Sequence, residues 1–238
     1  MTLFNTSRKN TEPAVHGNEV LRCYYDTLFA RLGRGPKIFL DLSCGSRSDI
    51  RRIVEGLGYT WVGVDIIDMP DIIKADAHAL PFRSDVFDIV FSAATLEHYK
   101  NPWVVAGEVQ RVLRKEGYMA GLVAFLQPEH GESYFHMTLN GVRTLLSDYG
   151  FDVLDVRPGQ LHGITYLIRS LFPKYLSPIG RVLSIYGDLL MVFRRVLFEL
   201  GIRLVYAKNT TKRERLLVFL TSDRMRYTAS VVFLARKR

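Results

Sequence analysis

The chain has 238 residues, of which 48% are apolar and 24% are charged. This composition is typical of one folded domain, or of one domain with an insertion, and it excludes a wholly disordered or collagen-like chain. The two cysteines, Cys23 and Cys44, provide no disulfide framework, and neither a secretory signal nor an apolar run of about 18 residues is visible. We therefore expect a cytoplasmic protein without disulfides.

The charge divides unevenly along the chain. Residues 1–156 contain 16 Lys and Arg and 20 Asp and Glu, which gives a net charge of −4. Residues 157–238 contain 16 Lys and Arg but only 4 Asp and Glu, which gives a net charge of +12. A basic final third favours an anionic partner, which could be a phosphate group, a nucleic acid or a membrane surface.

Apolar residues at helical spacing predict a first helix over residues 18–32, ended by Gly33. Short apolar runs then alternate with helical patterns as far as residue 156. The expected strands are 37–41, 59–65, 72–76, 87–92, 118–125 and 151–156, and the expected helices between them are 48–57, 103–113 and 139–149. This alternation indicates an α/β fold with a doubly wound, mainly parallel sheet that is covered on both faces.

The alternation stops after Pro158 and Gly159. Residues 161–206 are rich in Leu, Ile, Phe, Tyr and Arg and are expected to be helical, and the apolar runs 215–221 and 227–235 predict a hairpin. We expect a seven-stranded sheet with an antiparallel last strand and a helical insertion before it. The predicted parts are an N-terminal arm and cap helix (1–36), a core (37–160), an insertion or lid (161–206) and a C-terminal hairpin that completes the sheet (207–238).

The first loop of the expected sheet, residues 41–47, is made of small residues that let a ligand approach the backbone. Asp65 ends the second strand, 20 residues after Gly45, where a carboxylate can accept hydrogen bonds from two ribose hydroxyls. The alternative is an aspartate that only forms a turn. A dinucleotide site needs Gly-x-Gly-x-x-Gly, of which only Gly45 is present, so a nicotinamide cofactor is disfavoured.

Further motifs follow in order along the chain. They are Asp76-Ala-His-Ala-Leu-Pro-Phe82, Phe87-Asp-Ile-Val-Phe-Ser92 with Leu96-Glu-His98 after it, and Arg111-Val-Leu-Arg-Lys-Glu-Gly117. With these motifs residues 37–125 resemble a class I S-adenosylmethionine-dependent methyltransferase of the type 11 family. That family writes its motifs as Asp-x-Gly-x-Gly-x-Gly, a strand ending in Asp or Glu, Asp-Ala-x-x-Leu-Pro-Phe, and Phe-Asp-x-Val followed by Leu-Glu-His.

The resemblance implies a Rossmann-like core that binds S-adenosylmethionine. The methionine amino group would lie against Asp41 and the first loop, the ribose against the end of the second strand, the adenine against the Asp76 segment, and the sulfonium against the end of the fourth strand. Tyr24 or Tyr25, on the leading helix, would close over the methionine carboxylate. The implied cofactor-binding residues are Asp41, Ser43, Cys44, Gly45, Asp65, Ile66, Asp76, Ala77, Ser92 and Tyr25.

Two positions depart from the first motif of the family. Ser43 stands where the family has its first glycine, and Arg47 stands where it has its third. A serine suits this position if its backbone angles are ordinary, and its hydroxyl could then hydrogen-bond the ligand. Arg47 indicates a wider loop or a contact with the methionine carboxylate.

Methyl transfer mainly requires that the acceptor atom be placed in line with the sulfonium carbon. An oxygen acceptor also needs a base, and histidine has a suitable pKa. His98 follows the fourth strand, and His130 and His136 follow the fifth, so these three are the candidate catalytic residues; the alternative is that each is a loop histidine without a role. We expect no metal site, because the spacing of these histidines is not a convincing ligand pattern.

The basic final third allows several partners. Its helix around residues 183–197 could be a lid packed on the sheet, a dimer interface, or a basic and apolar surface that lies on an anionic membrane or receives a lipid-linked acceptor. Nucleic acid is disfavoured, because large aliphatic side chains separate the basic ones. The sequence thus favours O-methylation of a small-molecule, glycan or lipid-linked acceptor. The main alternative is a non-catalytic scaffold, ahead of an RNA methyltransferase or a nicotinamide enzyme.

Overall fold

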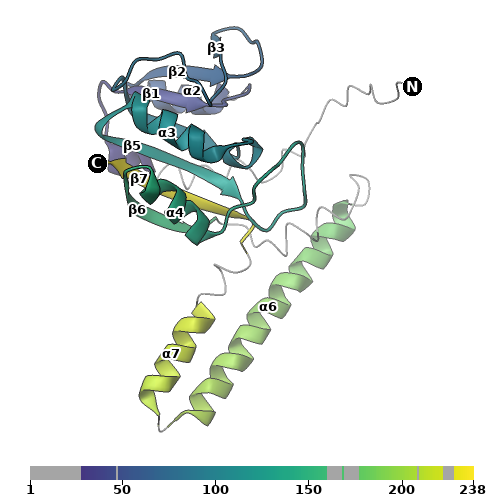
Figure 1. Cartoon of the computed structure of the whole chain (residues 1–238). Helices are drawn as coiled ribbons and strands as arrows, with labels where there is room; N and C mark the ends of the chain where they lie inside the picture. The colour runs from purple at the N-terminus through teal and green to yellow at the C-terminus, as the bar shows by residue number, and fades with distance from the viewer. Residues whose placement is uncertain (1–27, 47, 160–167, 169–176, 208, 222–227) are drawn as a thin grey trace. The chain divides into compact units, whose positions relative to one another are not determined.

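The computed structural model describes residues 28–46, 48–159, 168, 177–207, 209–221 and 228–238. The chain forms two units, residues 1–32 and residues 33–238. In the first unit residues 28–32 are helical, in agreement with the end of the helix expected over 18–32, and the rest of that expected helix lies outside the described residues. The second unit contains the sheet and the other described helices (Figure 1).

The sheet has seven strands in the order β3-β2-β1-β4-β5-β7-β6. Strands β1 to β5 are parallel, and β7 is antiparallel to both of its neighbours. This confirms the predicted fold class. The strands are β1 (Ile38–Leu42), β2 (Thr60–Asp65), β3 (Ile72–Lys74), β4 (Phe87–Ala93), β5 (Leu113–Ala124), β6 (Phe151–Pro158) and β7 (Ser230–Lys237).

Helices α2 (Ser48–Gly56), α3 (Pro102–Val112) and α4 (Leu139–Asp148) pack against the sheet. The start of α3 follows from its sequence: Pro102 stands in the first turn, and the Asn101 side chain accepts a hydrogen bond of 3.2 Å from the Val104 amide. Thr138 caps α4 in the same way through the Gly141 amide. The inward faces of α3 and α4 belong to the main hydrophobic core.

The order in which strands are added to the sheet reverses at its centre. From β1 the chain adds β2 and then β3 on one side, and it returns to add β4 on the other side. Both central strands are buried and apolar, as expected for parallel strands covered on two faces. The carboxyl ends of β1 and β4 therefore flank the crevice in which open α/β sheets bind their ligands.

One strand of the predicted C-terminal hairpin is wrong. Residues 215–221 lie in helix α7 (Thr210–Thr221), whereas the second expected strand is present as β7. A short apolar run such as Leu216–Leu220 does not distinguish a strand from a helix. The Asn209 side chain accepts a hydrogen bond of 3.0 Å from the Lys212 amide, and this cap starts a helix that continues through the apolar run.

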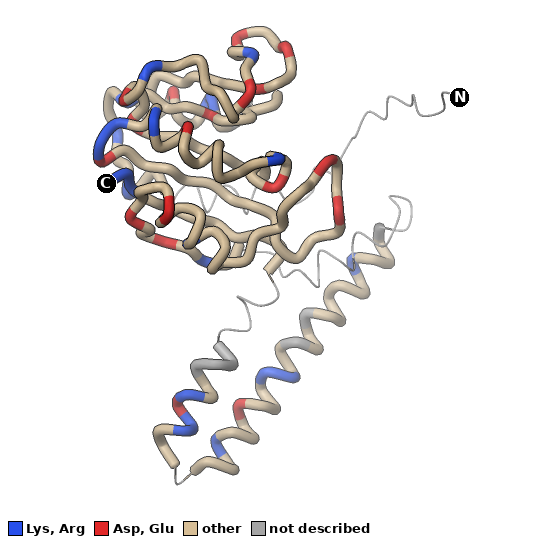
Figure 2. Tube along the Cα trace, in the orientation of Figure 1, with Lys and Arg blue, Asp and Glu red and all other residues tan. Residues whose placement is uncertain are grey.

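The insertion between β6 and β7 therefore holds two described helices, α6 (Ser177–Val205) and α7, which contact each other (Figure 1). Figure 2 shows one charged position near the start of α6 and several more in the second half of the helix. Among the residues that the structure describes, no helix combines the length and the apolar character needed to cross a bilayer.

Gly121 provides a test of the packing between β4 and β5. A Cβ atom at this position would lie 2.0 Å from the Ser92 carbonyl oxygen and 2.9 Å from the Phe233 ring. We expect Gly121→Ala to lower the free energy of unfolding by about 1–3 kcal/mol, because backbone must move to relieve the overlap. Urea denaturation would measure the change.

Gly56→Ala is the matched control. A Cβ atom at the end of α2 meets nothing within 4 Å, so this variant should equal the wild type or exceed its stability by up to about 1 kcal/mol. Equal stabilities for Gly121→Ala and Gly56→Ala would contradict the close strand packing.

Candidate functional site

Two non-glycine residues adopt left-handed backbone conformations where the central strands end. Ser43 follows β1 with a φ of 54°, and Ala94 follows β4 with a φ of 54°. Ser43 therefore does not meet the condition of ordinary backbone angles. Its hydroxyl shares a hydrogen bond of 2.7 Å with the Tyr99 hydroxyl, which ties the strained turn to the loop after β4. Strain of about 1–2 kcal/mol at such a residue is common at ligand sites.

The Asp65 carboxylate bridges the loops that follow β1 and β2. Its Oδ2 accepts a hydrogen bond of 2.8 Å from the Gly45 amide, and its Oδ1 accepts one of 3.0 Å from the Ile67 amide. The side chain is 7% exposed. Each carboxylate oxygen can accept a second hydrogen bond. Asp65 is therefore held in place with acceptor capacity left for a diol, and the residues present suit the ribose of a nucleoside cofactor.

The first loop offers acceptors to a ligand ammonium group. The amides of Cys44 and Gly45 donate to the Val64 carbonyl and to Asp65, so both are already engaged within the protein. Asp41 is fully buried at the end of β1, and its Oδ2 accepts a hydrogen bond of 3.4 Å from the Trp61 indole. Because an ammonium is a donor only, this arrangement suits the predicted contact with the methionine amino group.

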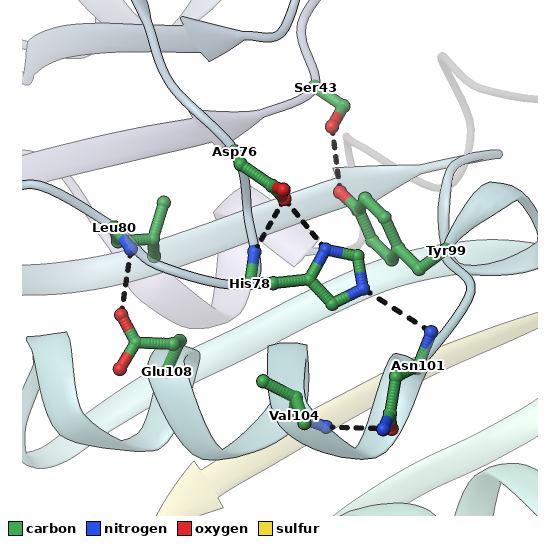
Figure 3. A network of polar contacts seen from close by, with 8 residues as sticks. All are labelled: Ser43, Asp76, His78, Leu80, Tyr99, Asn101, Val104 and Glu108. Carbon is green, nitrogen blue, oxygen red and sulfur yellow. Dashed lines mark hydrogen bonds and ion pairs between the residues drawn. The ribbon is translucent and has the colours of Figure 1, made fainter.

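A network of polar contacts fixes the segment after β3 (Figure 3). The Asp76 carboxylate accepts hydrogen bonds from the His78 amide at 2.9 Å and from His78 Nδ1 at 2.6 Å, and His78 Nε2 accepts from the Asn101 amide at 3.3 Å. Because Nε2 accepts, Nδ1 is the ring nitrogen of His78 that donates to Asp76. The amide of His78, and then its ring, lower the pKa of Asp76, so the predicted acceptor for the adenine amino group is ionised.

Three other predicted cofactor residues occupy distinct places. Ile66 directly follows the Asp65 carboxylate and exposes 69% of its surface, whereas Ala77 is buried. Ser92 is buried at the end of β4, where its hydroxyl bonds the Thr95 hydroxyl. Tyr25, and Arg47 with it, lie outside the described residues.

Glu108 and Arg111 on α3 brace the segment between β3 and β4. Glu108 accepts a hydrogen bond of 2.7 Å from the Leu80 amide, and Arg111 donates to the carbonyls of Leu80 and Phe82 at 3.0 and 2.7 Å. The two side chains also bond each other at 2.8 Å, and this contact with Arg111 lowers the pKa of Glu108. The adenine side of the site is therefore anchored to a helix of the core.

The three histidines predicted to be catalytic lie together. The ring centroid of His130 is 5.3 Å from that of His98 and 5.5 Å from that of His136. His98 comes from the short helix η1 (Leu96–His98) after β4, and the other two come from the loop after β5. Because β4 and β5 are neighbours, their carboxyl ends bring these segments to one edge of the sheet.

Glu97 is a member of this cluster that the sequence analysis missed. Its side chain is 1% exposed, and its Oε1 accepts a hydrogen bond of 3.2 Å from the Ala124 amide. Its backbone carbonyl accepts from the amides of Tyr134 and Phe135, so the β5–α4 loop is fastened to η1. Burial raises the pKa of Glu97. The Leu-Glu-His motif contained this residue, but no pattern in the sequence showed that its carboxyl would be buried.

Comparisons with known proteins agree with this geometry. Residues 40–121 match the family model of a methyltransferase domain. No curated protein matches the sequence.

Solved structures share the fold at low sequence identity. The cyclase SpnF has a TM-score of 0.59 and 14% identity, and the alignment covers 96% of this chain and 84% of SpnF. A sarcosine dimethylglycine methyltransferase from Galdieria sulphuraria, whose own assignment is provisional, has a TM-score of 0.55 and 13% identity over 92% of this chain and 85% of that one. Phosphoethanolamine N-methyltransferase 2 from Haemonchus contortus, in complex with S-adenosyl-L-methionine, has a TM-score of 0.54 and 18% identity over 93% and 52%. At these identities the likeness establishes the fold.

The brace on α3 gives a pH-dependent prediction. We expect Glu108→Gln to lower the free energy of unfolding at neutral pH by roughly 1 kcal/mol, because it removes a charged partner of Arg111. Folding lowers the pKa of Glu108 below its ordinary value. The charge of Glu108 therefore stabilises the folded chain fully at pH values above the ordinary pKa. This stabilisation is lost as the pH falls through the lowered pKa of the folded chain. Urea denaturation should show a gap between the two proteins at pH 7 that closes below about pH 4.3. A gap that stays constant between pH 7 and pH 3 would contradict the ion pair.

Proposed function

We propose that this chain, which carries a class I methyltransferase domain, transfers a methyl group from S-adenosylmethionine to an oxygen atom of a small-molecule, glycan or lipid-linked acceptor. The observation that carries the proposal is the Asp65 carboxylate, which is held between the loops after β1 and β2 and can still accept from two hydroxyl groups. The complex of the Haemonchus contortus enzyme with S-adenosyl-L-methionine supports the choice of cofactor.

The described residues offer candidate contacts for the amino group, the ribose and the adenine of such a cofactor. Asp41 and the first-loop carbonyls hold the amino group, Asp65 holds the ribose, and the ionised Asp76 accepts from the adenine amino group. The exposed Ile66 side chain, next to Asp65, offers an apolar surface to the adenine ring. When bound, the cofactor supplies an electrophilic methyl group on a sulfonium, so the main task of the protein is alignment.

The histidine cluster supports transfer to an acceptor hydroxyl, because the hydroxyl must lose its proton to a base when it is methylated. His98 is one residue from Tyr99, whose hydroxyl bonds Ser43 in the first loop, so the cluster is coupled to the cofactor loop by a single contact. His98 and His130 donate through Nδ1 to the carbonyls of Glu132 and Pro128, at 3.3 and 3.0 Å. With Nδ1 engaged by a carbonyl, Nε2 is the ring atom of each histidine that could accept a proton from an acceptor hydroxyl.

Ligand binding tests the proposal without knowledge of the acceptor. S-adenosylhomocysteine should raise the thermal midpoint of the wild-type protein, whereas NAD should not. Asp65→Ala should weaken S-adenosylhomocysteine binding on the order of 100-fold, because two hydrogen bonds to a charged group are lost. Calorimetric titration would give the dissociation constants.

Asp68→Ala is the matched control, since this side chain is 81% exposed and only faces Lys74 at 3.6 Å. It should bind like the wild type. A wild-type protein that ignores both ligands would favour the alternative of a non-catalytic scaffold, and a response to NAD alone would favour a nicotinamide enzyme.

The helical insertion supports a second element of the proposal, contact with an anionic membrane surface. Residues 177–221 contain 8 Lys and Arg and 3 Asp and Glu, a net charge of +5. The exposed large apolar side chains of α6 are Ile179, Val182, Leu183, Ile185, Tyr186, Leu189, Leu190, Val192, Phe193, Val196, Leu197, Phe198, Leu200, Leu204 and Val205. Apolar side chains combined with net positive charge are typical of helices that lie in the headgroup region of anionic bilayers.

Vesicle flotation tests this contact. The protein should float with vesicles that contain phosphatidylglycerol, less so with phosphatidylcholine alone, and less at high salt. Leu190→Glu combined with Phe193→Glu should reduce binding at least tenfold, because each apolar side chain contributes about 1.5–3 kcal/mol on burial. Leu154→Glu, at an exposed site on β6, is the control and should bind normally. A dimer that ignores vesicles, detected by light scattering, would show that α6 is a protein interface instead.

A further inference from the structure

Glu97, His98 and His130 can each direct one ligand atom to a common point. These three atoms lie within 4.8 Å of one another. His130 Nε2 and Glu97 Oε1 are 4.0 Å apart. Ligands bound at about 2.0–2.1 Å from a tetrahedral cation are about 3.3 Å apart, so small side-chain rotations would close the set around an ion. Within the part of the chain that the structure describes, no other group of three such side chains meets this geometry.

The histidines are oriented as metal ligands are. His98 Nδ1 is 3.3 Å from the Glu132 carbonyl, and His130 Nδ1 is 3.0 Å from the Pro128 carbonyl. A hydrogen bond from Nδ1 to a backbone carbonyl fixes the tautomer and leaves the lone pair on Nε2 for a metal. Both rings are therefore set by the backbone of a single loop.

Two buried polar atoms of the cluster have no hydrogen-bond partner among the residues that the structure describes. They are Oε2 of Glu97, whose side chain is 1% exposed, and Nε2 of His136. A buried acceptor without a partner costs about 1–3 kcal/mol. The His136 ring lies 5.5 Å from the His130 ring, so its Nε2 is near enough to serve as a fourth ligand after a rotation. One cation would satisfy both atoms.

We propose that Glu97, His98, His130 and His136 bind one divalent transition-metal cation of the Zn²⁺ type. Three imidazole nitrogens and one carboxylate oxygen favour Zn²⁺ and similar ions over Mg²⁺ or Ca²⁺, which prefer oxygen ligands. This departs from the expectation of no metal that came from the sequence. The spacing of His130 and His136 alone was unconvincing, because the other two ligands come from a different strand end.

The cation also bears on the chemistry at this edge of the sheet, and this part of the inference rests on the proposed function. An acceptor hydroxyl that joined the cation as a fifth ligand would lose its proton more readily, since a bound divalent cation stabilises the anion. The histidines would then act as ligands, and the proton would pass from the acceptor to solvent. The metal site itself does not depend on methyl transfer.

Metal titration of the full chain tests the site. Protein that has been treated with a chelator should bind one equivalent of Co²⁺, detected by its visible absorption, and Zn²⁺ should displace it. Glu97→Gln and His130→Ala should each weaken Co²⁺ binding at least tenfold, because each removes a ligand. Glu129→Gln removes an exposed carboxylate from the same loop, outside the proposed ligand set, and should leave Co²⁺ binding unchanged.

Thermal midpoints and S-adenosylhomocysteine binding of the same variants show whether they fold. His130 lies in a loop, so His130→Ala keeps the test valid if Glu97→Gln does not fold. Wild-type protein that binds S-adenosylhomocysteine but no Co²⁺, or folded variants that bind Co²⁺ as tightly as the wild type, would overturn the metal site and leave the proposed function standing. Wild-type protein that binds one equivalent of Co²⁺ but does not respond to S-adenosylhomocysteine would support the metal site and overturn the proposed function.

Discussion

The Asp65 carboxylate joins two loops that are 20 residues apart in the chain, and the rest of the cofactor side is built around this contact. The amides of Gly45 and Ile67 hold it from opposite sides. It can do so because β1 and β2 are parallel and in register, with Asp41 opposite Gly63, so the loops that follow both strands begin at the same edge. A ribose that binds there meets a carboxylate already oriented, which limits the entropy lost on binding.

The two sides of the site are constructed by different means. On the cofactor side, backbone amides fix carboxylates that remain partly free to accept, as at Asp65 and Asp76. On the histidine side, the backbone carbonyl of Glu97 fastens the loop after β5 to η1, and its buried carboxyl accepts from the Ala124 amide and lies beside the His130 ring. The Ser43–Tyr99 hydrogen bond joins the first loop to the loop after β4.

In this fold the residues that determine the reaction lie in loops and insertions and not in the sheet. The same architecture occurs in the cyclase SpnF and in methyltransferases with small substrates, so the sheet itself does not select a reaction. In this chain the loops after β4 and β5 hold the cluster of Glu97 with three histidines, and the insertion holds helices α6 and α7, with exposed apolar side chains and net positive charge.

The sequence by itself determined the order of strands and helices in the core and the acidic residues that end β1 and β2, because burial on both faces leaves long apolar runs closed by polar residues. It did not determine whether residues 215–221 form a strand or a helix, because an apolar run of five residues is too short to show a helical or a strand periodicity. In the structure the Asn209 side chain caps a helix that includes this run. Nor did it show that Ser43 is strained or that Glu97 is buried, because backbone angles and burial depend on packing. The meeting of His98 with His130 and His136 belongs to the tertiary structure alone: segments more than 30 residues apart come together because β4 and β5 pair in parallel.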